Sequence, residues 1–100
     1  MKRRKHSKQS VIRSPGHLTW VRGHACAVPG CVSPLIEAAH VRHGTDGGTA
    51  MKPGDNWAIP LCSHHHAEQH RRGGNLFDKD HGINSKDIAA ALWQKSPHRI

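Results

Sequence analysis

The chain has 100 residues, 35% of them hydrophobic, and a formal net charge of +8 at pH 7. These values predict one small domain with a thin core, and no apolar run approaches the length of a membrane span. The N-terminus lacks the apolar segment of a secretion signal, so we expect a cytoplasmic protein in a reducing environment. The positive charge indicates a polyanionic partner, most simply nucleic acid, with a generally basic surface as the alternative.

The three cysteines cannot all pair in disulfides. A small domain with few apolar side chains usually needs a staple, and in a reducing compartment clustered cysteines more often bind metal than cross-link. Three cysteines together with one histidine would make a closed zinc site. A histidine that completes such a site is therefore expected elsewhere in the chain.

Residues 1–16 combine a run of positive charge with almost no apolar content. This composition predicts a flexible basic arm, separate from a domain at residues 17–100. Its cations could contact phosphate groups or simply form a solvated tail. The candidate phosphate contacts in the arm are Lys2, Arg3, Arg4 and Lys5.

Residues 17–25 hold a short apolar cluster that could be a short strand or a lead-in segment, with Trp20 in the core. Next, Cys26 and Cys31 bracket a Pro-Gly turn. Zinc knuckles present two thiolates to one ion across a turn of this kind. Two unrelated buried cysteines are the alternative reading of this pair.

Residues 35–41 predict a short strand that ends near His40, and residues 57–61 predict a second. The segment between them is too rich in glycine to be regular. The two strands therefore predict a hairpin with a long connection. The candidate phosphate contacts in this connection are Arg42 and Lys52.

Residues 63–72 predict a helix, with Ser63 as the candidate N-cap and a glycine pair that ends it. Two arginines occupy its last turn, where positive charge suits the helix dipole. These arginines, Arg71 and Arg72, are also candidate phosphate contacts. A second helix is predicted at residues 86–95, capped by Asn84 or Ser85.

Residues 62–70, CSHHHAEQH, pack one cysteine and four histidines into nine positions. On a helix, His66 and His70 stack one turn apart, which is the spacing at which two imidazoles can hold one metal ion. His65 lies about 100° round the helix from His66, so it points elsewhere. It follows Cys62 by three residues, as in half of a zinc knuckle. One helix is thus predicted to carry a structural and a catalytic metal site. The predicted structural zinc ligands are Cys26, Cys31, Cys62 and His65.

The order strand, histidine, loop, strand and histidine-rich helix resembles the HNH endonucleases, whose core is a ββα-metal fold. The likeness covers roughly residues 24–93 and rests on the segments CAVPGC, EAAHVRHG, DNWAIPLCSHHHAEQH and GGNLFDKDHGIN. It is closer to small phage and prophage proteins related to a phage recombination-enhancement nuclease. The resemblance implies an α+β, zinc-stapled ββα-metal domain with a C-terminal helix, working in a bacterial host cell.

The resemblance also implies roles for individual residues. His40 matches the strand-end histidine that serves as general base, and Asn56 lies where a residue helps to hold that base. His66 and His70 match helix ligands of a catalytic divalent metal, which could be Mg²⁺, Mn²⁺ or Zn²⁺. The four predicted zinc ligands match the structural site, with His65 in place of a more usual cysteine.

Two positions depart from the family pattern. Ala39 precedes the base where many HNH motifs carry a metal-binding Asp or His, so Asp55 or water is the candidate third ligand. Asn56 stands six residues before Cys62, one more than the commonest spacing, so Asp55 or backbone is an alternative for the middle position.

The expected function is metal-dependent hydrolysis of phosphodiester bonds in double- or single-stranded DNA, with a recombinase–DNA filament as a further candidate partner. The alternative is a zinc-dependent nucleic-acid-binding module without catalysis, which the missing ligand at Ala39 favours. A metal-buffering histidine-rich protein is a third reading, but the ordered strand–loop–helix layout argues against it. The pattern carries no signal for the oligomeric state.

Overall fold

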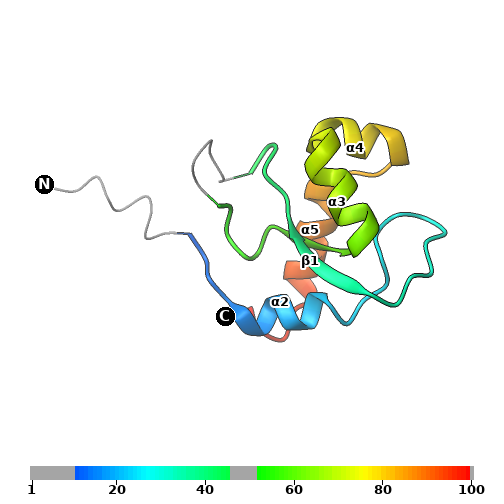
Figure 1. The fold of residues 1–100 in the computed structure, drawn as a ribbon. Helices are drawn as coiled ribbons and strands as arrows, with labels where there is room; N and C mark the ends of the chain where they lie inside the picture. Colours follow the sequence, from blue (N-terminus) through cyan, green and yellow to red (C-terminus); the bar gives the residue numbers. More distant parts are fainter. Residues whose placement is uncertain (1–10, 46–51, 100) are drawn as a thin grey trace, which may run out of the picture.

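The computed structural model describes residues 11–45 and 52–99 (Figure 1). In this part of the chain, a two-stranded antiparallel sheet is combined with four helices, which confirms the predicted α+β class. The elements are α2 (Pro15–Val21), β1 (Ile36–His40), β2 (Ala58–Cys62), α3 (Ser63–Arg72), α4 (Gly74–His81) and α5 (Ser85–Lys95). The arm cations Lys2, Arg3, Arg4 and Lys5 lie outside the described residues.

Helix α2 occupies the segment for which a strand or lead-in was expected, so that prediction was wrong. The Ser14 side chain caps the helix by accepting a hydrogen bond from the His17 N–H at 3.3 Å. Pro15 occupies the first turn, where its fixed φ suits the helix and its missing N–H is not needed. The serine–proline pair is thus a helix start signal. The boundary drawn between residues 16 and 17 falls inside this helix.

Strands β1 and β2 pair with Ile36 opposite Cys62 and His40 opposite Ala58. The predicted hairpin with a long connection is therefore confirmed. All five residues of β2 are buried, and Ile59 and Leu61 lie at the centre of the core. A backbone hydrogen bond of 2.8 Å from Val41 to the Trp57 carbonyl continues the pairing past the strand ends.

Helix α3 has the predicted bounds and follows β2 without a linker. Its N-cap is Cys62 rather than Ser63, because the Cys62 sulfur accepts from the His65 N–H at 3.4 Å. Gly73 ends the helix with φ 85°, a conformation that suits glycine. The same glycine precedes α4, a helix that the sequence analysis did not predict and that buries Phe77 completely.

Helix α5 begins at Ser85, one residue before the predicted start, and ends at the predicted residue. Asn84 caps it by accepting from the Asp87 N–H at 2.9 Å. Helix α2 contacts both strands on one side of the sheet, while α3 contacts them on the other and α5 packs on β2 (Figure 1). None of the helices in residues 11–45 and 52–99 has both the length and the apolar character needed to cross a bilayer.

Candidate functional site

The predicted structural zinc ligands come together in the fold. One ligand atom from each residue lies within 4.8 Å of all the others, and this set is called the zinc cluster below: Cys26, Cys31, Cys62 and His65. The Cys31 and Cys62 sulfurs are 3.8 Å apart, and Nδ1 of His65 lies 3.2 Å from the Cys62 sulfur. Sulfurs bound tetrahedrally to Zn²⁺ at about 2.3 Å lie about 3.8 Å apart, so the donors fit this ion.

Local backbone contacts build the zinc cluster. The Ala27 N–H donates to the Pro60 carbonyl at 2.8 Å, which holds the cysteine turn against β2. The Cys62 N–H points at the Cys26 sulfur at 3.4 Å. Burial raises the pKa of the Cys26 thiol, whereas a backbone hydrogen bond at Ser33 lowers that of Cys31. Metal binding to the cluster must therefore displace a proton from at least the buried thiol.

His65 presents a neutral ring to the cysteines. Its Nδ1 also lies 3.5 Å from the Cys26 sulfur. Burial lowers the pKa of His65, and repulsion from neighbouring His81 and His64 acts in the same direction. The neutral imidazole is the form that binds a metal.

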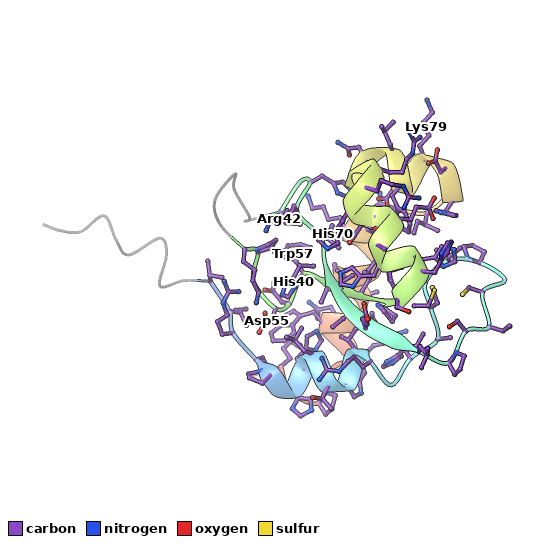
Figure 2. The ribbon with its side chains drawn as sticks, viewed as in Figure 1. His40, Arg42, Asp55, Trp57, His70 and Lys79 are labelled. Carbon is purple, nitrogen blue, oxygen red and sulfur yellow. The ribbon has the colours of Figure 1, made fainter. Side chains whose placement is uncertain are left out.

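His40, the predicted general base, is paired with Asp55. Nε2 of His40 lies 2.9 Å from Oδ1 of Asp55, which comes from the loop before β2 (Figure 2). The other carboxylate oxygen accepts from the Ser14 N–H at 2.7 Å, and the Arg13 guanidinium lies 3.7 Å from Oδ1. A buried carboxylate is thus held between His40 and the start of α2.

The electrostatics of this pair follow from burial and hydrogen bonding. Burial raises the pKa of Asp55, but hydrogen bonds from His40 and the Ser14 N–H outweigh it, so its pKa lies below the usual range. Burial lowers the pKa of His40, and this outweighs the opposing effect of the carboxylate. The preferred state is therefore an ionised Asp55 that accepts a hydrogen bond from the N–H of a neutral His40 imidazole.

Asp55, and not the predicted Asn56, is the residue that contacts His40. The Asn56 side-chain oxygen is buried and has no hydrogen-bond partner among the described residues. Both oxygens of Asp55 contact His40 or the Ser14 N–H, so Asp55 is a partner of His40 rather than of His66 and His70. The alternative assignment of the middle position to Asp55 agrees with this geometry.

His66 and His70 face each other on α3, as their spacing predicted. Their Nε2 atoms are 3.2 Å apart, close enough to share one ion at about 2.0–2.1 Å from each. Nδ1 of His66 lies 2.6 Å from Oε1 of Glu37 on β1. Sequence reasoning missed Glu37, whose only local signal is a charged residue on a strand three positions before His40.

A cleft of about 820 Å³ lies at the junction of β1, α3 and α4. Its lining residues are His40, Arg42, His43, Gln69, His70, Arg72 and residues 73–76. Figure 2 shows His40, Arg42 and His70 near one another, while Lys79 lies apart on α4. The cleft thus brings the predicted base and one predicted metal ligand to the same space, and His70 connects it to His66.

The candidate phosphate contacts take different positions. Arg42 and Arg72 line the cleft, and Arg72 also forms two hydrogen bonds to Asp80, at 2.8 and 3.0 Å. Lys52 and Arg71 are exposed. Arg13, which the sequence analysis placed in the flexible arm, donates instead to the Pro53 carbonyl at 2.7 Å.

A family described as a protein of unknown function (DUF968) matches residues 1–96. The chain belongs to this DUF968 family. Every residue of the zinc cluster and of the cleft lies within the match. No curated protein and no solved structure matches the chain significantly.

His43, which lines the cleft of this DUF968 protein, forms a second histidine–aspartate pair with Asp78. Nε2 of His43 lies 3.1 Å from Oδ2 of Asp78, and the same carboxylate accepts from the N–H and hydroxyl of Ser85. A β-carbon added to Gly74 would overlap the imidazole of His43. The imidazole therefore packs against a bare glycine and ties the segment after β1 to α4 and α5.

Proposed function

We propose that this DUF968 protein is a metal-dependent endonuclease of the HNH type that hydrolyses phosphodiester bonds in DNA. One observation carries the proposal: His40, backed by Asp55, shares a cleft with His70, whose Nε2 is 3.2 Å from that of His66. The strand–strand–helix order of β1, β2 and α3 supports the assignment to a ββα-metal core.

His40 is suited to act as the base. With its Nε2–H donated to Asp55, the ring keeps the lone pair of Nδ1 for a proton. The lowered pKa of His40 keeps the imidazole unprotonated near neutral pH. A histidine oriented by a carboxylate is an effective general base for this reason.

Hydrolysis then requires the following transfers. A water oxygen attacks phosphorus while Nδ1 of His40 takes the water proton. The bond from phosphorus to the leaving sugar oxygen breaks, and that oxygen is protonated by solvent. The guanidinium group of Arg42 would hold a flanking phosphate by charge, and Arg72 lines the same cleft but is held by Asp80.

His66 and His70 would hold the catalytic divalent ion, Mg²⁺, Mn²⁺ or Zn²⁺. When bound, the ion supplies positive charge to the phosphoryl group and to the leaving oxygen. Glu37 accepts a hydrogen bond from the Nδ1–H of His66, so the lone pair of Nε2 is available to the metal. The zinc cluster has a separate task, which is to hold the cysteine turn, β2 and α3 together.

The positive charge of the chain supports DNA as the partner, through the cleft arginines and the cations at positions 2–5. We extend the proposal to a recombinase–DNA filament as a presenting partner and to a bacterial cytoplasm. Both extensions rest on the resemblance to phage and prophage HNH proteins.

A zinc-dependent nucleic-acid-binding module without catalysis is the second candidate. Ala39 favours it, because this fully buried residue offers no metal ligand directly before the base. Such a module would bind DNA through the same basic surface and would need only the zinc cluster. It would make no use of the His40–Asp55 pair.

The deciding experiment measures cleavage of supercoiled plasmid and of single-stranded DNA. Weakly held metal is removed first, and Mg²⁺, Mn²⁺ or Zn²⁺ is added back to wild type, His40→Ala and a control, His98→Ala, at an exposed position. Metal-dependent cutting that only His40→Ala loses would support the nuclease. DNA binding without cutting under every metal, with and without a recombinase filament, would favour the binding module.

A further inference from the structure

The outer side of α3 carries donor groups that neither the zinc cluster nor the cleft uses. His64 and Glu68 are four residues apart in this helix, so they share one face. Their ligand atoms and one of His65 all lie within 4.8 Å of one another. Oε1 of Glu68 also lies 3.1 Å from Nε2 of His81, in the last turn of α4.

His65 forms the floor of this group. Its Nδ1 is directed at the cysteine sulfurs, so the other edge of the ring is left for the outer side. The rings of His64 and His81 each lie 5.2 Å from the His65 ring. Glu68 thus lies within reach of a donor atom of His64 on its own helix and of Nε2 of His81 on α4, beside the zinc cluster.

We propose that His64, Glu68 and His81 form a second transition-metal site that bridges α3 and α4. Two imidazoles and a carboxylate suit borderline divalent ions such as Zn²⁺, Ni²⁺ or Cu²⁺, whereas Mg²⁺ prefers oxygen ligands throughout. Three protein donors leave a coordination position open, so this site exchanges its metal more readily than the closed zinc cluster.

The surroundings of Glu68 leave it available. Arg72 lies one turn further along α3, but Asp80 holds its guanidinium with two hydrogen bonds of 2.8 and 3.0 Å. The side chains of His81 and Glu68 are 20% and 19% exposed, so solvent and ions reach them without opening the fold. His64 is exposed and free to turn toward an ion.

A metal at this site would act on the cleft. Residues 73–76, at the start of α4, line the cleft, and His81 lies at the other end of the same helix. An ion that joins His81 to α3 would restrain α4, and hence the side of the cleft that residues 73–76 form. The alternative to a metal site is that Glu68 and His81 form only a hydrogen bond, which holds α3 and α4 together.

The test is calorimetric titration of Ni²⁺ into the zinc-loaded full chain. Two double variants are compared with wild type: His64→Gln with His81→Gln, and His66→Gln with His70→Gln. We expect each pair to lose a different equivalent of Ni²⁺, and Glu68→Gln to weaken the outer site at least tenfold. Unchanged stoichiometry and affinity in the His64/His81 variant would overturn the proposal.

Two further measurements distinguish loss of the outer metal site from loss of the fold and from loss of nuclease activity. Zinc content and circular dichroism report whether each variant keeps the zinc cluster. In wild type, bound Ni²⁺ should broaden the imidazole NMR signals of His64 and His81 before those of His98, and equal broadening would overturn the site. Neither readout depends on DNA cleavage, so a failed nuclease proposal leaves this test intact.

Discussion

Oε1 of Glu37 lies 2.6 Å from Nδ1 of His66, which turns the opposite nitrogen of that ring toward His70. Carboxylates in this position fix the tautomer and orientation of metal-binding histidines. Strand β1 therefore brings a carboxylate to the histidine pair although Ala39 carries none. If the chain is an HNH nuclease, as proposed, Glu37 partly offsets the metal ligand that Ala39 does not supply.

Replacing Glu37 should weaken metal binding without unfolding the chain. We expect Glu37→Gln to lower the affinity of the His66–His70 pair for Mn²⁺ by about 10–100-fold, the usual effect of losing such a partner. Electron paramagnetic resonance of free Mn²⁺ gives the affinity, with Asp87→Asn as an exposed control. Equal affinities in all three proteins would reduce the Glu37 contact to a surface ion pair.

Asp55→Asn should slow cleavage while preserving DNA binding. An amide can present its N–H to the ring and favour the wrong tautomer, so we expect a rate lower by roughly 10²–10⁴-fold. Single-turnover cleavage and a filter-binding assay measure the two properties on the same DNA. A variant that cuts at the wild-type rate would show that the pair is structural only.

The rate of cleavage should fall at acid pH. Below the pKa of His40 the ring is protonated and cannot take a proton from water, so activity is present above this pKa and lost below it. Because burial lowers that pKa, the midpoint should lie under the value of about 6.5 for a free histidine. Asp55 opposes this shift, so Asp55→Asn should move the midpoint of the residual activity lower still. A midpoint above 6.5 would contradict the assignment.

Loss of the zinc cluster should unfold the domain, because metal binding contributes directly to folding in such small units. We expect Cys31→Ser and Cys62→Ala to lose both zinc and the cooperative melting transition seen by circular dichroism. His66→Ala should keep both and lose only cleavage. An unchanged melting curve for Cys62→Ala would remove zinc as the staple.

Gly74→Ala should destabilise the fold through His43. The added β-carbon would overlap the ring and displace it from Asp78. We expect a cost of about 1–3 kcal/mol, as for overpacking elsewhere. In a His43→Ala background the same change should cost much less, which a denaturation cycle measures. Additive costs would show that the ring and the glycine do not interact.

The sequence predicted those helices and strands whose bounds depend on residues close together in the chain. The hairpin, the bounds of α3 and the Asn84 cap of α5 follow from apolar patterning and capping, and Cys62 with His65 follows from spacing. Helix α4 was missed because two glycines indicate a helix end, whereas Gly73 both ends α3 and precedes α4.

The contacts of Asp55 and Glu37 could not be predicted from spacing. His40 and Ser14 are 15 and 41 positions away from Asp55 in sequence. The Asp55 carboxylate contacts them only after the loop before β2 has folded against β1 and α2. Glu37 meets His66 across 29 positions, through the packing of α3 on β1. Such pairs are set by tertiary packing, and no helix or strand period encodes them.

The zinc cluster also has a mechanical consequence for α3. Because His65 is pinned by its Nδ1 to the cysteine sulfurs, the rotational phase of the whole helix about its axis is set at its first turn. The direction of every later side chain on α3 then follows from the direction of His65, at about 100° per residue. Inserting one residue between His65 and His66 would turn the histidine pair away from Glu37, whereas the connection between the strands can change length without altering that angle. A metal bound at the zinc cluster would thereby also set the direction of His66 and His70.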